Sequence, residues 1–348
     1  MNVEVPSTFW VGLDDTDERE HGCTTHDFND LLVTLSKSGM EIDDARLVRL
    51  WPFAPQRTRG NAALAAAVKC DDIIHLEEIL QQWFESKYSS VIAQSEPHSA
   101  QPTLVLVRDQ LPEVLYWETV REYVDLEDRT YHLASLYHRI WSTDAGCAGL
   151  IGATAAIAWR GHNDWTWECT AWRNEGGVRN VPGKSVAEMA EKFPGTILNR
   201  DPNLKRSLIA PRTPCPVLYG IRGEEQSDVL SAHNFLQDFP VEQSTSYRVF
   251  RTNQATDDHL EAFHDSTVAS IQIMTGGHVE IHAGVTLLAF SQGGEINKLA
   301  QTLKEGDQIR WFGLSGPDGT YHLEKLKLTY GQRNHRRPLC SCGSRYKS

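Results

Sequence analysis

Three carboxylates lie within four residues, Asp14-Asp15-Thr16-Asp17, directly after an apolar segment, residues 8–13, that favours a β-strand. Carboxylates this close repel one another unless a cation neutralises them. Magnesium in proteins is bound by one or two carboxylates together with phosphate oxygens. The cluster therefore indicates a magnesium and phosphate site, with Asp14 and Asp15 as metal ligands. The alternative is a solvated loop whose aspartates cap a helix.

A run of small residues, Cys23-Thr24-Thr25, follows the acidic cluster. Apolar residues at helical spacing predict a helix over residues 24–38, which Gly39 ends. The run thus lies at a helix N-terminus, where free backbone N–H groups and the helix dipole attract phosphate. A threonine hydroxyl here is either a nucleophile towards a phosphoryl group or an N-cap.

Two further segments combine arginine with residues that change the flexibility of the backbone, glycine in one segment and proline in the other. Residues 57–61, Arg-Thr-Arg-Gly-Asn, set two guanidinium groups beside a glycine, which predicts a phosphate clamp or an exposed basic loop. Residues 213–223 read Thr-Pro-Cys-Pro-Val-Leu-Tyr-Gly-Ile-Arg-Gly. Two prolines stiffen the start of a predicted strand, and Arg222 lies at the other end of this strand. By spacing alone, these residues could simply mark where the strand begins and ends.

The chain has neither a P-loop nor a G-x-G-x-x-G motif, so the two commonest nucleotide-binding folds are not supported.

The composition is that of a globular chain, with 40% hydrophobic and 23% charged residues, and it excludes bulk disorder. No apolar run reaches the ~20 residues of a membrane helix, and residues 1–10 lack a secretory signal, so we expect a cytoplasmic protein.

The net charge of −12 argues against a nucleic-acid partner when it is averaged over the chain. Residues 1–30 carry eight acids and one base, however, and residues 324–348 carry seven bases and one acid. This asymmetry suggests metal binding at one end and contact with a polyanion at the other.

The spacing of apolar residues predicts three consecutive regions of regular structure. The first is an α+β unit, with strands at 8–13, 45–51 and 62–68, helices at 24–38 and 74–87, and a linker at 93–102. The second begins near residue 131 and alternates strands with helices, which predicts an α/β sandwich of the ferredoxin-like type. The third, beyond residue 264, has short strands and one helix within about 65 residues, as in an OB-fold.

In this order, the motifs resemble those of the archaeal TiaS family, the tRNA-isoleucine agmatidine synthetases. The matching segments are residues 10–17, 23–25, 58–61, 149–153, 213–223 and 253–260. The resemblance covers about residues 8–345, and the eleven residues 213–223 are its most specific part. Members of this family convert the wobble cytidine of the minor isoleucine tRNA, which has a CAU anticodon, to agmatidine.

The resemblance implies an α+β multidomain chain. It places a kinase-like α/β domain that binds ATP at residues 1–130, a ferredoxin-like domain at 131–264 and an all-β OB-fold that binds RNA at 265–331. Residues 332–348 are then a basic tail, the remnant of a zinc ribbon. The family's ribbon has two Cys-x-x-Cys pairs, whereas this tail has only Cys340-Ser341-Cys342, so we do not expect zinc.

The resemblance also implies site residues. Thr24 matches the threonine that the family phosphorylates on itself, and Asp14, Asp15 and Asp17 match its acidic loop for nucleotide and magnesium. We expect the contacts to ATP to come from Arg59, Asn61 and Thr25. Substrate contacts are expected from Arg222, Cys215, Tyr219, Asn253, Asp257 and His259, and the carboxylate of Asp257 is the expected partner of the agmatine guanidinium. The family commonly has one more residue between glycine and the Cys-Thr-Thr run than His21-Gly22 leaves here.

The sequence thus predicts a ligase that uses ATP and magnesium to join agmatine to tRNA, with no membrane partner and no obligate protein partner. Two alternatives stay open. The chain could be a non-catalytic RNA-binding protein whose OB-fold holds single-stranded loops and whose acidic cluster is structural. It could also be a small-molecule kinase that needs no RNA for turnover.

Overall fold

The computed structural model describes residues 7–18, 21–55, 57, 60–89, 100–162, 164–174, 176–201, 206–331 and 341–342. These residues form two compact units, Met1–His259 and Leu260–Ser348, each with apolar cores of its own. The prediction of a mixed α+β chain is confirmed. Within the described ranges, no helix is both long and apolar enough to cross a membrane.

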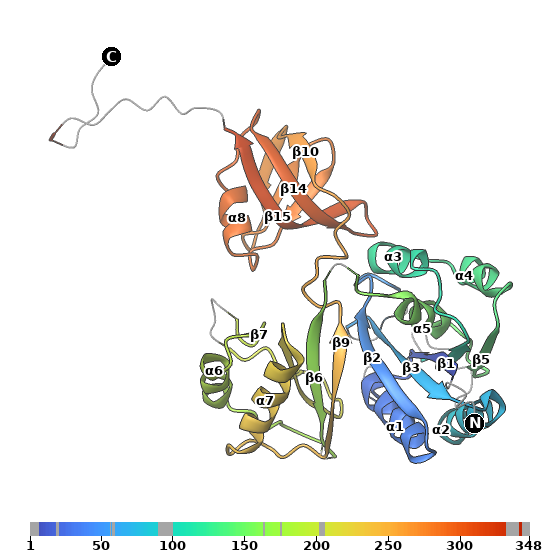
Figure 1. Cartoon of the computed structure of the whole chain (residues 1–348). Helices are drawn as coiled ribbons and strands as arrows, with labels where there is room; N and C mark the ends of the chain where they lie inside the picture. The colour runs from blue at the N-terminus through green and yellow to red at the C-terminus, as the bar shows by residue number, and fades with distance from the viewer. Residues whose placement is uncertain are drawn as a thin grey trace. The chain divides into compact units, whose positions relative to one another are not determined.

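The first unit is built on one sheet of nine strands, in the order β5-β4-β1-β3-β2-β9-β6-β8-β7 (Figure 1). In chain order, the strands are β1 (Ser7–Asp14), β2 (Glu41–Arg49), β3 (Ala62–Cys70), β4 (Thr103–Val107), β5 (His138–Ser142), β6 (Thr166–Trp172), β7 (Thr196–Ile197), β8 (Val217–Gly223) and β9 (Ser246–Thr252). All neighbours are antiparallel except β2 and β9, which pair in parallel with Arg46 opposite Arg251 and Leu47 opposite Thr252. The two α/β regions expected from the sequence therefore share a continuous sheet.

Helices cover both faces of the first half of this sheet, β1 to β5. Helices α1 (Thr24–Lys37) and α2 (Ile73–Tyr88) pack on one face, against alternate residues of β1 such as Val11 and Leu13. Helices α3 (Val114–Arg121), α4 (Leu126–Leu133) and α5 (Gly149–Ala158) pack on the other face, against Ala63 and Ala65 of β3. Strand β3, Ala-Ala-Leu-Ala-Ala-Ala-Val-Lys-Cys, is buried over residues 63–68, and it suits a position between two helical layers because both of its faces are apolar there.

Helix α5 lies unusually close to β1 because each of the two elements has a glycine at the contact. A Cβ built on Gly12 would lie 2.6 Å from the carbonyl oxygen of Ala153, and one on Gly149 would lie 2.7 Å from that of Asp14. Both distances are shorter than real Cβ atoms show. Side chains at these positions would push the helix away from the end of β1, where the acidic cluster begins.

The residues that follow the expected boundary at residue 130 pack on the first half of the sheet. Strand β5 pairs with β4, and α5 packs on β1, β3 and β4, so residues 131–158 belong by packing to the first half of the sheet. The second half consists of β6 to β9, covered by α6 (Gly183–Lys192) and α7 (Gln226–Gln237). Most of the linker expected at 93–102 lies outside the described residues.

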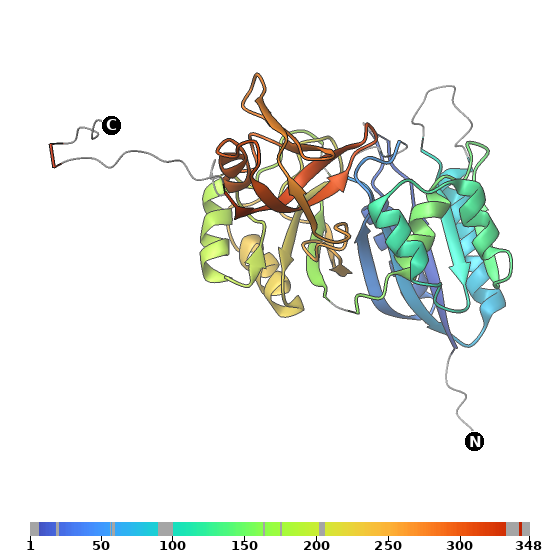
Figure 2. The same ribbon diagram turned by 90° about the horizontal axis from the view of Figure 1, so that it is seen from above.

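The second unit is a separate sheet of six strands, in the order β10-β14-β15-β13-β12-β11 (Figure 2, orange and red). Its elements are β10 (His264–Thr267), β11 (Ser270–Ile273), β12 (Val279–His282), β13 (Thr286–Ala289), α8 (Glu295–Ala300), β14 (Gln308–Ser315) and β15 (Thr320–Tyr330). Strands β13 and β15 pair in parallel, and the other neighbours are antiparallel. The interior contains Val279, Ile281, Leu287, Ile309 and Trp311.

Candidate active site

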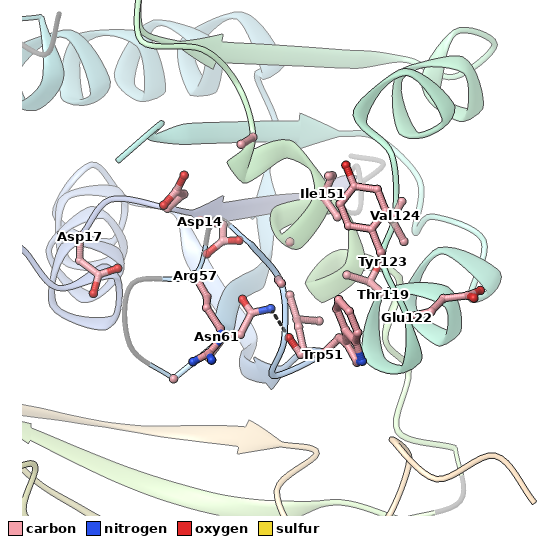
Figure 3. A pocket seen from close by; sticks show the side chains of 17 residues that line it. Asp14, Asp17, Trp51, Arg57, Asn61, Thr119, Glu122, Tyr123, Val124 and Ile151 are labelled. Carbon is pink, nitrogen blue, oxygen red and sulfur yellow. Dashed lines mark hydrogen bonds between the residues drawn. The ribbon is translucent and has the colours of Figure 1, made fainter. Parts of the chain in front are cut away.

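The acidic cluster lies at the edge of the sheet where β1 and β2 end and β3 begins. Both β1 and β2 pair antiparallel with β3, so they run in the same direction and their last residues, Asp14 and Arg49, are at the same edge. A cavity opens here (Figure 3). Its lining is polar on one side, with Asp14, Asp17, Arg57 and Asn61, and largely apolar on the other, with Trp51, Tyr123, Val124 and Ile151. An apolar slot beside an acidic edge is suited to a nucleotide whose phosphates carry a cation.

Two carboxylates of this cavity are held in surroundings that oppose their negative charge. Burial and then the charge of Asp15 raise the pKa of Asp14 well above its ordinary value. Burial also raises the pKa of Asp15 to about 7, with further contributions from Asp17 and Glu18, against the hydrogen bond that the backbone N–H of Gln101 donates to Asp15 Oδ2 at 3.0 Å. A cation at this point would restore both carboxylates to their charged form.

The donors at this edge fit a magnesium ion that is also bound by phosphate. Among the described residues, no group of three or more His, Cys, Asp or Glu side chains is arranged to hold a metal ion by itself. Asp14 and Asp15 are oxygen donors of the kind magnesium prefers, and the remaining positions would be filled by phosphate and water. This donor set therefore suits a metal that arrives with a nucleotide better than a resident metal.

Thr24 is the first residue of helix α1, and its hydroxyl is not used to cap the helix. The N-cap position is taken by Cys23, whose side chain makes no capping hydrogen bond. Thr24 Oγ1 instead donates to Asp17 Oδ1 at 3.2 Å, which joins the helix start to the acidic loop. Burial raises the pKa of the neighbouring Cys23 thiol to about 11, so this thiol stays neutral and is a poor nucleophile.

The start of α1 is anchored on both sides. Thr16 in the acidic loop donates to Asp27 Oδ2 at 2.8 Å, and Tyr88 of α2 donates to the same oxygen at 3.0 Å. From the second half of the sheet, the indole N–H of Trp172 donates to Thr25 Oγ1 at 3.2 Å. These bonds fix the acidic loop, the helix start and β6 in one arrangement.

A second cavity adjoins the first one and shares Asp17, Gly60 and Ala62 with it. Cys23, Thr24 and Thr25 line one side of this second cavity. The other side comes from β6, β8 and the segment before β8, with Glu168, Thr170, Leu208, Ile209, Pro211, Thr213, Cys215, Val217, Gly220 and Arg222. A group bound here would lie between Thr24 and the second half of the sheet.

An ion-paired cluster lies in the wall of the second cavity. Glu168 Oε2 accepts from Arg49 Nη2 at 3.0 Å and from Arg222 Nε at 3.1 Å. Burial would raise the pKa of Glu168, but the two arginines hold it below its ordinary value. Glu168 is therefore a carboxylate that stays charged while almost fully buried.

The segment before β8 is held by one arginine. Arg179 donates to the carbonyl oxygens of Val217 at 2.7 Å, Pro211 at 2.9 Å, Thr213 at 3.0 Å and Cys215 at 2.8 Å. The same guanidinium lies 3.1 Å from Cys215 Sγ. Since four of these residues line the second cavity, Arg179 sets the shape of that wall.

The structure brings together most of the residues predicted from the sequence. Asp14, Asp15, Asp17 and Asn61 line the first cavity, and Thr24, Thr25, Cys215 and Arg222 line the second. Arg59 lies outside the described residues. The amide of Asn61 donates to the carbonyl oxygen of Trp51 at 2.7 Å, which fixes its side chain across the first cavity.

Two predicted substrate residues are buried in this structure. Tyr219 is fully buried under α7, where its hydroxyl pairs with His233 Nδ1 at 3.0 Å. Asn253 is buried and exchanges hydrogen bonds with the backbone of Arg49, at 2.7 and 2.9 Å. It therefore joins the end of β9 to β2, and the substrate contacts of both residues stay predictions.

The remaining two, Asp257 and His259, line neither cavity. They follow Asn253 in the loop after β9, and Asp257 has a left-handed backbone with φ of 62°.

Sequence reasoning missed Arg49, Glu168 and Trp51. Glu168 had a visible signal, since it is the one charged residue in the otherwise uncharged strand Thr-Trp-Glu-Cys-Thr-Ala-Trp. A charge in such a strand needs a partner, and here it has two.

Known proteins resemble this chain over most of its length. Models of the TiaS TCKD domain and the TiaS FLD domain match residues 10–141 and 148–259. The isoleucine-tRNA 2-agmatinylcytidine synthetase TiaS of Pyrococcus horikoshii is 32% identical, over 97% of this chain and 85% of that protein. The protein of the same name from Methanopyrus kandleri is 30% identical, over 95% of this chain and 83% of that protein. A crystal structure of TiaS in complex with its isoleucine tRNA and ATP matches with a TM-score of 0.81 and 27% identity, over 98% of this chain and 86% of that one.

Proposed function

The chain belongs to the TiaS family, and we propose that it joins agmatine to the wobble cytidine of the minor isoleucine tRNA, with ATP as the phosphoryl donor. One observation carries the proposal. Two adjoining cavities lie at one sheet edge, an acidic cavity suited to a nucleotide and a cavity lined by Thr24 and Arg222, and both lie within the matched domains. A ligase that brings together ATP, an amine and a nucleoside needs such adjoining sites.

We assign the two halves of the nine-stranded sheet to a kinase-like and a ferredoxin-like domain, and the second unit to an OB-fold. The parallel pairing of β13 with β15 and the helix between β13 and β14 support the OB-fold. Strands β10 and β11 stand at opposite ends of the strand order although they are adjacent in sequence, as expected for one bent strand that closes a barrel. An OB-fold in this place supplies a surface for the anticodon arm of the tRNA. Such a substrate is consistent with a cytoplasmic protein.

In the first cavity, the base of ATP would contact the apolar side with Trp51 and Tyr123, and the phosphates would reach the acidic side. Asp14 and Asp15 would hold magnesium, which neutralises phosphate oxygens when it is bound. Arg57 and Asn61 line the same cavity and would contact the phosphates, as predicted for Asn61 and Arg59. Asp17 would act differently, because it accepts the hydrogen bond of the Thr24 hydroxyl.

The chemistry starts from a poor electrophile, since C2 of cytosine does not readily lose its oxygen. In the first step, that oxygen attacks the γ-phosphorus of ATP, an O–P bond forms and the bond to ADP breaks. In the second step, the primary amine of agmatine bonds to C2 and the C2–O bond breaks. Inorganic phosphate then leaves with one proton from the amine. Positioning and charge neutralisation supply most of the catalysis in phosphoryl transfer of this kind.

We further propose that Thr24 accepts a phosphoryl group in a transfer separate from the two steps above, in which Thr24 Oγ1 bonds to the γ-phosphorus of ATP, the bond to ADP breaks and Asp17 takes the hydroxyl proton. Its hydroxyl is at a helix N-terminus, points to Asp17 and lines the second cavity. Replacement by valine keeps the shape of the side chain and removes the hydroxyl. We expect Thr24→Val to lose incorporation of ³²P from [γ-³²P]ATP into the protein, and Thr24→Ser to retain it. Labelling of Thr24→Val at the wild-type level would exclude this role.

The proposed function is tested by mass spectrometry of the wobble nucleoside after incubation of the full chain with ATP, agmatine and a transcript of the minor isoleucine tRNA. We expect 2-agmatinylcytidine, and none when ATP or agmatine is left out. RNA binding without any ATP turnover would support a non-catalytic RNA-binding protein. Phosphoryl transfer to a small molecule without RNA would support a small-molecule kinase.

The carboxylate that binds the agmatine guanidinium stays a prediction. Asp257 was proposed for its chemistry, but it does not line the second cavity. Agmatine affinity of Asp257→Ala compared with the wild type decides the point.

A further inference from the structure

We propose that Arg49, Glu168, Arg222 and Thr170 form an oxyanion subsite that holds the phosphoryl group on the activated wobble cytidine until that group leaves as inorganic phosphate. The inference rests on the proposed function and assigns a role to a part of the second cavity. All four side chains line that cavity, opposite the start of helix α1.

The register of strands β6 and β8 holds the side chains of the cluster in place. Glu168 and Arg222 are direct partners in the register of β6 with β8, and Thr170 lies two residues further on the same face of β6. Opposite Thr170 stands Gly220, on which a Cβ would lie 2.5 Å from Glu168 Oε1. Glycine at position 220 thus leaves room for the carboxylate beside β8, where it holds both guanidinium groups.

The cluster offers more hydrogen-bond donors than its own carboxylate uses. Glu168 Oε2 accepts one hydrogen bond from each arginine, which leaves further N–H groups on both. Two buried polar atoms of this cluster have no partner in the described part of the chain, Arg49 Nε and Thr170 Oγ1. Thr170 is only 2% exposed, so water from the bulk does not satisfy its hydroxyl. The remaining N–H groups of the arginines would pair with an acceptor-rich ligand in the cavity, and a turn of the Arg49 and Thr170 side chains on binding would bring the two buried atoms to it.

The charge of the cluster selects an anion over the agmatine guanidinium. Two guanidinium groups share one carboxylate, which leaves one positive charge in a largely buried wall. A third guanidinium would place three positive charges around Glu168. A phosphoryl group would bring the opposite charge, and arginine matches its oxygens in geometry as well as charge.

The reaction places a phosphoryl group in the same region. Once the cytosine oxygen carries it, the C2–O bond must break while the amine nitrogen bonds to C2, and the electron pair of that bond goes to the phosphate oxygen. Negative charge then increases on the leaving phosphate, which takes one proton from the amine. Donors that are already held in place by Glu168 stabilise this charge without reorganising.

The experiment compares full-length variants in steady-state incorporation of labelled agmatine into the minor isoleucine tRNA. We expect Arg222→Gln to lower kcat about 100-fold, with the KM for ATP changed less than about threefold, because the arginine does not line the first cavity. Arg222→Lys, which keeps the charge, should recover part of this loss. Thr170→Val removes only the hydroxyl and should lower kcat about tenfold without lowering Tm. Inorganic phosphate serves as the binding probe, and its inhibition constant should rise about tenfold in Arg222→Gln.

Arg139→Gln is the matched control, since Arg139 pairs with Glu77 at 3.3 Å and lines neither cavity. It should keep wild-type kcat. The proposal is overturned if Arg222→Gln and Thr170→Val keep the wild-type kcat, or if their effect is confined to the KM for agmatine. A wild-type chain that makes no product would instead contradict the proposed function, so the two failures are distinguishable.

Discussion

Asp15 has a left-handed backbone, with φ of 58°, and its carboxylate is half-buried between the end of β1 and Gln101. A non-glycine residue in this conformation costs of order 1 kcal/mol, and such strain concentrates at functional sites. Burial and the charges of Asp17 and Glu18 raise the pKa of the same carboxyl to about 7. The free site is thus destabilised in two ways, and a bound cation would relieve the electrostatic one.

The raised pKa of Asp15 predicts a pH dependence near neutrality. Below pH 7 the carboxyl is protonated, and magnesium must displace that proton. The apparent KM for magnesium-ATP should therefore rise by up to about tenfold for each unit by which the pH falls. Without nucleotide, and between about pH 4 and 7, Asp15 is protonated in the folded chain but ionised in the unfolded chain. The free energy of unfolding should therefore fall as the pH rises through this window. Measurements of KM and Tm from pH 5.5 to 8 check both directions.

Asp15→Asn is the control for this prediction, since asparagine does not titrate. This variant should fold, lose ATP turnover and show a smaller fall of Tm with pH, with Asp14 contributing what is left. Turnover at saturating magnesium equal to that of the wild type would contradict the role of Asp15.

Single residues were predictable from the sequence where the chemistry is local. Asp14, Asp15 and Thr24 are close together in the chain, and they lie between the end of a predicted strand and the start of a predicted helix. The sequence therefore predicted that they lie at the same edge of the sheet. Glu168 and Arg49 are 119 residues apart, and only the pairing of β2 with β9 and of β9 with β6 joins them. The burial of Tyr219 in the core was not predictable, because the motif does not reveal which alternate residues of β8 face the helices.

At the scale of elements, helix α5 is the part that the acidic edge depends on most closely. A Cβ on Gly152 would lie 1.9 Å from Asp14 Oδ2 and 3.1 Å from the Cβ of Ala63. The glycine-rich start of this helix was visible in the sequence, but its contact with β1 was not, because periodicity does not say which sheet face a small-residue helix covers.

Gly152→Ala should therefore displace either the Asp14 carboxylate or the helix. We expect the KM for ATP to rise at least tenfold and Tm to fall, although alanine favours a helix by about 1 kcal/mol over glycine. Gly183→Ala in α6 is the matched control, because a Cβ there meets nothing within 4 Å. Kinetics and thermal unfolding of both variants decide the matter, and wild-type behaviour of Gly152→Ala would refute the contact.

The segment of residues 211–217 depends on Arg179 in a similar way. Arg179→Met should free its carbonyl partners, while Arg179→Lys should keep one or two of them and have an intermediate effect. Since this segment lines the second cavity and not the first, we expect kcat/KM for agmatine to fall about tenfold with the KM for ATP unchanged. Arg206→Gln is the control, because Arg206 is half-exposed and pairs with Asp201. A parallel loss in the KM for ATP would indicate general unfolding and contradict a positioning role.

At the scale of the whole molecule, the structure divides after residue 259, close to the boundary expected at residue 264. Both cavities and all residues discussed for catalysis lie in the first unit, whose cores contain no residue beyond 250. The second unit has its own core and was the region best predicted from the sequence, because short strands and turns at regular spacing carry a local signal. The continuous sheet of the first unit depends on one parallel pair between residues about 200 positions apart, which no local pattern reveals.

This division predicts that phosphoryl chemistry and RNA binding are separable. A chain that ends at residue 262 keeps both cavities and all three cores of the first unit, so it should fold with a Tm within a few degrees of that of the full chain. We expect it to retain incorporation of ³²P from ATP into Thr24, because ATP and Thr24 need only the two cavities. Its affinity for the minor isoleucine tRNA, measured by filter binding at fixed salt, should fall at least tenfold, and agmatine incorporation should fall with it, since the surface assigned to the anticodon arm is gone. Affinity for tRNA equal to that of the full chain would place the RNA contacts in the first unit and contradict the role assigned to the second.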